Sequence, residues 1–259
     1  MNKVILLKNK TIPIDHYDTI FRTGGYEPVF LPLIQHTHVS EEILYLLQDE
    51  AYLKKLDIII ITSQRAVECL NESVIPQLDK CSTETLFNKT LYTVGPATQN
   101  FLVRSGFKRV HGGASTGNGS ALADLLISDL YKSNLDPKSC KVLFLVGETR
   151  RDIIPKKLNK EGIEVEEIVT YKTETLLDNV IRFKKEFESI DWVAFFSPQG
   201  TEGIVEYLRS KGNPSVASIG PTTETYLQSK GLKPTVVSEK PDATSLLSSI
   251  NEARKKMSS

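Results

Sequence analysis

The chain has 259 residues, enough for one large domain or two ordinary ones, each with its own buried core. Its 32 basic side chains balance 32 acidic ones, so no overall field favours nucleic acid or an anionic membrane as a partner. The sequence shows no apolar run near the ~18 residues of a membrane span and no signal-peptide pattern at its start. Cys69, Cys81 and Cys140 lack a CxxC spacing, and the histidines form no HExxH motif. We therefore expect a cytoplasmic protein with reduced thiols and no metal.

Taken in chain order, the first half alternates extended and helical patterns. The helix after the first strand is expected to end at Gly24 and Gly25. The segment over 57–63, DIIIITS, is continuously apolar and β-branched, which is typical of a strand buried on both faces. The predicted elements are a strand over 3–8, a helix over 16–25, an extended segment over 26–34, a helix over 40–56, a strand over 57–63, a helix over 65–78, a strand over 90–95, a helix over 96–106, a strand over 108–113 and, after a loop, a helix within 115–133.

The second half continues in the same way from another buried strand, KVLFLVG. Its predicted elements are a strand over 141–147, a helix over 150–162, an alternating strand over 164–174, a helix over 178–190, a strand over 191–197, a helix over 200–212, a strand over 216–220, a helix over 221–231, a strand over 234–238 and a helix over 242–257. Strands separated by helices predict parallel sheets covered on both faces.

One unit of this pattern occurs twice. Residues 93–109 read TVGPATQNFLVRSGFKR, and residues 218–234 read SIGPTTETYLQSKGLKP. In both, a β-branched approach leads to Gly-Pro, a small residue and a Thr, then a helix that ends at Gly. Because a Ser-centred turn precedes each copy, the repeat predicts two similar α/β domains.

Four turns follow strands of this pattern: TSQR (62–65), GPAT (95–98), SPQG (197–200) and GPTT (220–223). Ser63, Ser197 and Thr222 or Thr223 could each serve only as a helix cap. The alternative is that these small, hydroxyl-bearing turns line anion sites built from free backbone N–H groups, since parallel strands bring such turns to one edge of the sheet.

Arginines follow two of the predicted strands, close to their carboxyl ends. Arg65 follows the first turn, and Arg150 and Arg151 follow the strand over 141–147. They could lie in solvated first helical turns, but a cation opposes the dipole at a helix N-terminus, so a bound carboxylate or phosphate would explain them better. The Gly-rich stretch over 112–120 has no GK[ST], which weakens a nucleotide-binding interpretation. Tyr171 could be an ordinary half-buried aromatic residue.

The chain resembles the uroporphyrinogen-III synthase family over nearly its whole length. The resemblance is carried by IIIITSQRAVE, LYTVGPAT, VLFLVGETRRDIIPKKL, EGIEVEEIVTYKT, VAFFSPQG and ASIGPTTETYLQSKG, in this order. It implies an α/β fold of two flavodoxin-like parallel-sheet domains, joined by two extended connections, with a cleft between them. Residues 1–35 and 173–259 would form one discontinuous domain, and residues 36–172 an inserted one.

The resemblance also implies an enzyme. The family cyclises the linear tetrapyrrole hydroxymethylbilane, loses water and inverts the last ring, without metal or cofactor. This chain would then be a carbon–oxygen lyase, acting as a monomer on a polycarboxylate, with neither nucleic acid nor a membrane as a partner. Tyr171 matches the tyrosine to which the family's general-acid role is assigned. The substrate-binding residues would be Thr62, Ser63, Arg65, Gly95, Thr98, Gly147, Arg151, Ser197, Gly200, Gly220, Thr222 and Thr223.

Two other functions are consistent with parts of the pattern. A two-lobed binding protein that closes on a small polyanion without reaction would need the same fold and the same hydroxyl-rich turns. A nucleotide-dependent transferase would use the loop over 112–120. Conversion of hydroxymethylbilane separates the synthase from both.

Overall fold

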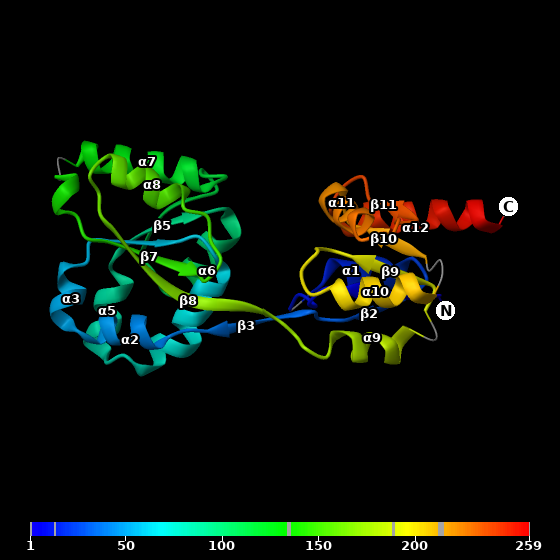
Figure 1. Ribbon diagram of the computed structural model, residues 1–259. Coiled ribbons are helices and arrows are strands. Elements are labelled where there is room, and N and C mark those ends of the chain that lie inside the picture. The colour runs from blue at the N-terminus through cyan, green and yellow to red at the C-terminus, as the bar shows by residue number, and fades with distance from the viewer. Residues whose placement is uncertain (1, 13, 134–135, 188–189, 212–214, 259) are drawn as a thin grey trace. The chain divides into compact units, whose positions relative to one another are not determined.

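The computed structural model describes residues 2–12, 14–133, 136–187, 190–211 and 215–258 (Figure 1). The chain divides into two compact units, unit 1 (Met1–Gln35 and Glu174–Ser259) and unit 2 (His36–Thr173), and it crosses from one to the other twice. Each unit holds a mainly parallel sheet with helices on both faces. The predicted α/β fold with parallel sheets is therefore confirmed.

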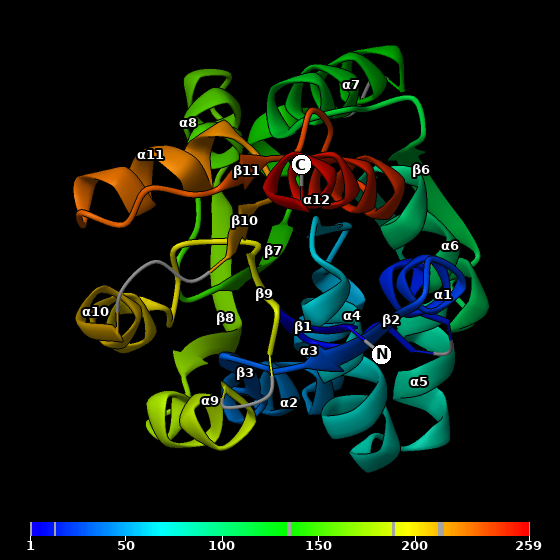
Figure 2. The ribbon, with the colours of Figure 1, turned by 90° about the vertical axis from the view of Figure 1, so that its right-hand side faces the viewer.

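Unit 1 contains a parallel sheet whose order, among the described residues, is β11 (Val236–Val237), β10 (Val216–Ser218), β9 (Trp192–Phe195), β1 (Asn2–Leu7), β2 (Tyr26–Phe30). This is the flavodoxin-like order, with the second strand outside the first. Figure 2 shows α1 (His16–Thr23) and α12 (Ala243–Ser258) away from α9 (Asn179–Phe187), α10 (Glu202–Lys211) and α11 (Pro221–Ser229). These two helix groups cover opposite faces.

The sequence of β1 explains this layering. Val4, Ile5, Leu6 and Leu7 are all buried, and because side chains alternate along a strand, two of them face each helix layer. Val4 and Leu6 pack with the cluster under α1 and α12, whereas Ile5 and Leu7 pack with the cluster under α9 to α11. A continuous apolar run is what a strand covered on both faces requires.

The sheet of unit 2 has the order β3 (Ile34–His38), β8 (Val165–Thr175), β7 (Val142–Gly147), β4 (Ile58–Ile61), β5 (Thr90–Val94), β6 (Arg109–Gly113). The strands from β4 to β8 pair in parallel. β3 runs against β8, because Val39 N–H donates to Thr170 O and His36 contacts Thr173.

Helices cover both faces of this sheet as well (Figure 1). Ile59 and Ile61 of β4 pack with one helix layer, and Ile58 and Ile60 with the other. The first layer contains α2 (Glu41–Gln48), α3 (Glu50–Lys55), α4 (Gln64–Cys69), α5 (Lys80–Phe87) and α6 (Pro96–Arg104), and the second contains α7 (Gly119–Lys132) and α8 (Ile153–Lys160).

Several predicted elements differ in detail. The expected helix over 40–56 is broken at Asp49, whose extended backbone lets its carboxylate accept from Ala51 N and Tyr52 N and so cap α3. The helix α5 was not predicted. The expected helix over 65–78 continues from α4 as a π-helical turn (Leu70–Val74) and a 3-10 turn (Ile75–Gln77), where Pro76 lacks the N–H for a regular ladder.

The expected extended segment over 26–34 is likewise two strands, since β2 ends at Phe30 and β3 begins at Ile34. The predicted continuations of α9 to residues 188–189 and of α10 to residue 212 lie outside the described residues.

Each sheet has one point where the strand order reverses direction. In unit 1 it lies between β1 and β9, and in unit 2 between β4 and β7. Ligands of open parallel sheets bind beyond the carboxyl ends of the strands at such a switch point, because the loops diverge there and helix N-termini point into the gap.

Candidate functional site

A cavity of about 550 Å³ lies at the switch point of unit 2. It opens beyond the carboxyl ends of β4, β7 and β8 and between the first turns of α7 and α8. Its volume is within the ~300–1,000 Å³ of small-molecule sites. The lining residues are Thr62, Ser63, Val94, Asn118, Gly119, Ser120, Phe144, Leu145, Val146, Gly147, Thr149, Arg150, Arg151, Ile153, Ile154 and Tyr171.

A β-bulge sets the face of the sheet on which Tyr171, one of these lining residues, lies. Val146 is paired with Val169, but the next residue, Gly147, is paired with Tyr171, so Thr170 is the extra residue of β8. A bulge turns the following side chain to the other face of the strand. Tyr171 accordingly packs against the cluster that contains Ile168, not the one that contains Val169. The Thr170 hydroxyl is buried and donates to Val146 O at 3.2 Å, which stabilises the bulge.

The ring of Tyr171 lies directly over Gly147. A Cβ placed on Gly147 would come within 2.6 Å of Tyr171 Cζ and 2.8 Å of its hydroxyl oxygen. Glycine at this position therefore makes room for the phenol. On another side, the His36 ring meets the Tyr171 ring edge-on, with 6.4 Å between centroids.

His36 was not predicted as a site residue from the sequence, where it alternates with His38 and shows no metal-binding motif. Its Nδ1 is 3.0 Å from the Thr173 hydroxyl. Burial lowers the pKa of the imidazole below its usual value, and the nearby Arg65 lowers it further, while Glu68 opposes this. Burial and Arg65 thus both favour the neutral form of the imidazole.

Two helix N-termini border the cavity. Asn118 caps α7, with its side chain accepting from Ala121 N at 3.0 Å. Asp152 precedes α8 but makes no side-chain cap bond, so the first N–H groups of α8 are left for another acceptor. Arg151 stands beside them, is exposed, and has no ion-pair partner within the described part of the chain. Backbone donors and a free guanidinium suit a carboxylate or a phosphate.

The other two arginines are neutralised by neighbours. Arg150 Nε donates to Glu167 at 2.6 Å, and Arg65 Nη1 donates to both oxygens of Glu68 at 2.7 and 2.6 Å. Arg65 is also absent from the residues that line the cavity. Its expected contact with substrate is therefore a prediction that has no support from the cavity.

The first of the four turns, at residues 62–65, both caps a helix and lines the cavity. Ser63 caps α4, its hydroxyl accepting from Arg65 N at 3.2 Å. Both Thr62 and Ser63 also line the cavity.

The two Gly-Pro turns are built alike, although they belong to different units. Gly95 and Gly220 occupy the N-cap positions of α6 and α11, each followed by Pro at the first helical position, and neither helix has a side-chain cap bond. Of the two alternatives for this turn, capping by Thr222 or Thr223 is excluded, because a glycine stands at the cap position. Gly95 has φ 77°, which favours glycine.

The threonines of these turns are mostly hidden. Thr98 is 6% exposed and Thr223 is 4% exposed, while Thr222 is exposed. Within the described ranges, no hydrogen bond is made by the hydroxyl of Thr98 or of Thr223. Each copy of the repeat thus places an unpaired hydroxyl in the first turn of a helix.

The remaining predicted residues lie in unit 1. Ser197 is exposed, and α10 does not begin until Glu202, so Ser197 does not cap that helix as expected. Gly200 has φ 76°, and its carbonyl accepts from Asn179 Nδ2 at 3.0 Å. A Cβ there would lie 2.9 Å from Leu33 O, so close packing explains this glycine.

The structure therefore brings five predicted residues to one cavity: Thr62, Ser63, Gly147, Arg151 and Tyr171. Gly95 and Thr98 lie in the same unit but do not line it. Sequence reasoning missed Asn118, Gly119 and Ser120 as lining residues, although an Asn just before a helical pattern is a recognisable N-cap. Among the described residues, no group of three His, Cys, Asp or Glu side chains could hold a metal ion, and no helix has the length and apolarity to cross a membrane.

Comparisons with known proteins agree with each other. A family model described as uroporphyrinogen-III synthase HemD matches residues 15–248. Uroporphyrinogen-III synthase of Saccharomyces cerevisiae is 52% identical over 264 residues, which cover 96% of this chain and 95% of that protein. The synthase of Schizosaccharomyces pombe is 36% identical over 255 residues, 96% of each chain.

Solved structures show the same fold at lower identity. Uroporphyrinogen-III synthetase of Helicobacter pylori has a TM-score of 0.61 and 18% identity, covering 97% of this chain and 99% of that one. A mutant uroporphyrinogen III synthase of Thermus thermophilus has a TM-score of 0.56 and 18% identity, covering 99% and 100%. At this identity the likeness concerns the fold alone.

Proposed function

The chain belongs to the uroporphyrinogen-III synthase family, and we propose that it converts hydroxymethylbilane to uroporphyrinogen III. The reaction is that of a cyclising carbon–oxygen lyase. The bond between the hydroxymethyl carbon and its oxygen breaks, one water is released, and the macrocycle closes with the last pyrrole ring inverted. The family match favours this activity over a binding protein that performs no reaction.

The observation that carries the catalytic part of the proposal is the position of Tyr171. Its phenol lines the switch-point cavity, is oriented by the bulge at Thr170, and lies over Gly147. A phenol keeps its proton at neutral pH and can donate it to a departing hydroxide. In the proposed first step, the electron pair of the pyrrole nitrogen expels that hydroxide, and Tyr171 protonates it to water. The substrate is left as a protonated azafulvene (azafulvenium) and Tyr171 as a phenolate.

The next steps move electrons within the substrate. The substituted α-carbon of the last ring attacks the azafulvene carbon and forms a spiro intermediate. The intermediate reopens and recloses with the ring inverted. Loss of one proton then restores aromaticity, and a proton returns to the Tyr171 phenolate, directly or through solvent. Because the substrate supplies both nucleophile and electrophile, the protein's main contribution is to hold the flexible chain in one geometry, which can supply several kcal/mol.

The protein is proposed to bind the substrate through its carboxylates. Arg151 and the first N–H groups of α8 form a donor set at the cavity, and Thr62 and Ser63, which also line it, add hydroxyl groups. The first turns of α6 and α11 offer further N–H groups, with Thr98 and Thr223 beside them. Ser197, Gly200, Gly220 and Thr222 remain proposed contacts of unit 1, and a monomeric, cytoplasmic enzyme that needs no cofactor remains a prediction.

One assay tests the activity. Purified protein is mixed with hydroxymethylbilane, the products are oxidised to porphyrins, and the type I and type III isomers are separated. We expect type III to predominate, with type I in the protein-free control because unassisted closure does not invert the ring. Predominance of type I in both samples would contradict the proposal. The same assay with EDTA tests whether a metal is required.

A further inference from the structure

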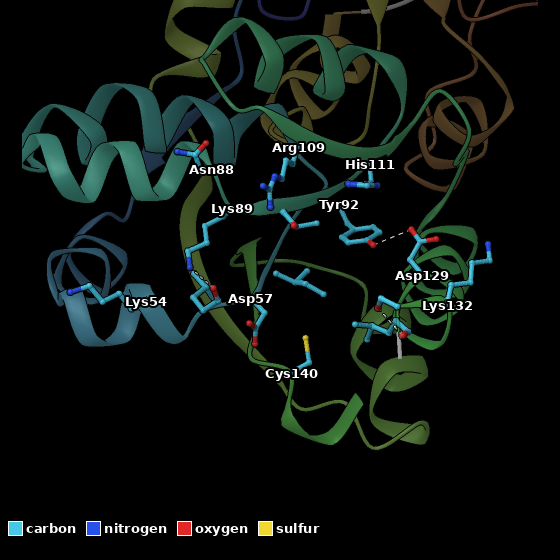
Figure 3. A pocket seen from close by; sticks show the side chains of 15 residues that line it. Lys54, Asp57, Asn88, Lys89, Tyr92, Arg109, His111, Asp129, Lys132 and Cys140 are labelled. Carbon is cyan, nitrogen blue, oxygen red and sulfur yellow. Dashed lines mark hydrogen bonds between the residues drawn. The ribbon is translucent and has the colours of Figure 1, made fainter. Parts of the chain in front are cut away.

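A second cavity, of about 820 Å³, lies at the opposite, amino edge of the sheet in unit 2 (Figure 3). Ile58, Thr90 and Arg109 begin β4, β5 and β6, are neighbours in register, and all line it. None of its lining residues is shared with the candidate functional site. They are Lys54, Leu56, Asp57, Ile58, Asn88, Lys89, Thr90, Tyr92, Arg109, His111, Asp129, Leu130, Lys132, Ser133 and Cys140.

The cavity is locally positive in a chain without net charge. Its lining has four cationic side chains and two acidic ones, and one of the cations, Lys54, is already paired with Glu50 at 2.9 Å. Both carboxylates already accept hydrogen bonds, Asp57 from Lys141 N at 2.8 Å and Asp129 from the Tyr92 hydroxyl at 3.0 Å. The surplus of positive charge favours an anion.

Lys89 and Arg109 are the cations with hydrogen-bond donors still available to a ligand. Lys89 Nζ donates to Leu56 O at 2.5 Å, which uses one of its three donors. Burial lowers the pKa of this ammonium, and the charge of Asp57 only partly offsets the effect. Arg109 makes no ion pair with any described residue, which leaves its guanidinium donors available.

The wall between these cations and Asp129 is flat and aromatic. Tyr92 is 3% exposed, and the exposed ring of His111 stacks on it with centroids 5.2 Å apart and planes 24° apart. Figure 3 shows the Tyr92 hydroxyl turned toward Asp129 and the Cys140 thiol turned into the hollow. Leu56, Ile58, Leu130 and Cys140 give the cavity an apolar floor.

We propose that this cavity binds a small aromatic anion, with its phosphate or carboxylate group at Lys89 and Arg109 and its flat ring against the Tyr92–His111 pair. The volume is that of a small-molecule site, roughly 300–1,000 Å³. Stacking on an aromatic pair favours a ring, and the paired cations favour the anionic group. The site does not depend on the proposed synthase activity, because no residue of that reaction lines it.

Three probes separate the contributions in calorimetric titrations of the full chain. Adenosine 5′-monophosphate carries a ring and a phosphate, benzene-1,3,5-tricarboxylate carries a ring and carboxylates, and ribose 5-phosphate has no aromatic ring. We expect at least one aromatic probe to bind at least tenfold more tightly than ribose 5-phosphate. The aromatic probe that binds more tightly shows whether the cavity prefers a phosphate or a carboxylate.

Variants locate the binding. Arg109→Gln and Lys89→Gln should each weaken the better aromatic probe by about tenfold or more, because each removes a charge-assisted hydrogen bond. His111→Ala should weaken it by a similar factor through lost stacking. Arg104→Gln, an equal loss of charge on α6, should change nothing, and all these variants should keep wild-type activity on hydroxymethylbilane. Circular dichroism checks that each one folds.

Several results would overturn the inference. These are no binding of either aromatic probe at millimolar concentration, equal binding of ribose 5-phosphate, and equal weakening by Arg104→Gln. Loss of binding in Arg151→Gln but not in Arg109→Gln would place the anion at the other edge of the sheet and would equally refute it.

Discussion

The two switch points of this protein have the same topology but different contents. In unit 2, the carboxyl ends of β4 and β7 open into a cavity with a free guanidinium and a directed phenol. In unit 1, Lys8 directly follows β1 at the corresponding place, next to Phe196, which directly follows β9. Lys8 forms an ion pair with Asp15 and lies 5.2 Å from the ring centroid of Tyr17, 5.1 Å from that of Phe30 and 5.9 Å from that of Phe196.

The side chains at these two places therefore serve different ends. Asp15 is 3% exposed, accepts from Thr11 N and Tyr17 N at 2.8 Å each, and caps α1. A buried carboxylate with this many donors contributes to stability. It also neutralises the charge of Lys8. Arg151 and Tyr171 have no such partners, which leaves them available to a ligand. The cavity of unit 2 thus leaves a cation and a phenol available to a ligand, whereas in unit 1 the charges of Lys8 and Asp15 satisfy each other. The proposed substrate contacts of unit 1 lie instead at the turns before α10 and α11.

The largest effect is expected from Tyr171→Phe. If the phenol is the general acid, kcat should fall by a factor within roughly 10²–10⁴. Substrate affinity and melting temperature should change little, since the ring still packs against the same cluster. Steady-state kinetics and thermal denaturation measure both. A fully active variant would remove Tyr171 from the mechanism.

A loss of stability without a loss of activity is expected at the Lys8–Asp15 pair of unit 1. Asp15→Ala leaves Lys8 unpaired and removes a helix cap, which should lower the free energy of unfolding by about 3–5 kcal/mol. Activity measured well below the melting point should be retained. Glu50→Ala, which breaks an exposed pair with Lys54, is the control and should cost less than about 1 kcal/mol. If urea denaturation showed equal losses of unfolding free energy in Asp15→Ala and Glu50→Ala, the structural role of Asp15 would be contradicted.

The same carboxylate predicts a pH dependence. Burial alone would raise the pKa of Asp15, but the hydrogen bond from Lys8 and those from backbone N–H groups outweigh it and hold the pKa at about 2. The unfolded chain binds this proton at about pH 4. The stabilisation by Asp15 is therefore present above about pH 4 and lost as the pH falls toward 2. The difference in unfolding free energy between wild type and Asp15→Ala should shrink across that window.

Gly147→Ala tests how the open edge positions its phenol. The added Cβ would displace the Tyr171 ring, which is the free end of a side chain, so the cost in stability should be small. Because a displacement of about 1 Å can cost up to 10²-fold in rate, kcat should fall at least tenfold. Gly117→Ala, whose Cβ would meet nothing within 4 Å, is the matched control and should be neutral. Unchanged kcat in both variants would count against a precise placement of Tyr171.

The smallest effects are expected where the two units are most alike. Thr98→Ala and Thr223→Ala each remove a hydroxyl that has no partner within the described chain, so melting temperatures should hardly change. If these hydroxyls contact substrate carboxylates, each variant should raise KM by an amount worth about 1 kcal/mol. A drop in stability with unchanged KM would assign the threonines to packing instead.

Elements whose signals are local could be predicted from the amino-acid sequence. The apolar runs over 57–63 and 141–147 predicted the central strands of unit 2, and the two Gly-Pro motifs predicted where α6 and α11 begin. Local patterns suffice here because burial on both faces and a helix start are properties of a few consecutive residues. The break at Asp49 was missed because an Asp inside a helical pattern caps only when its own backbone is extended.

Contacts between distant residues, by contrast, could not be predicted and follow from the packing of the whole fold. The bulge at Thr170 turns Tyr171 to the face of Ile168, and nothing in an alternating strand pattern announces an extra residue. The pairing of Lys8 with Asp15, and the meeting of His36 with Tyr171, join residues from different elements. Such contacts depend on strand order and register, which are set by the packing of whole layers and not by any short stretch of chain.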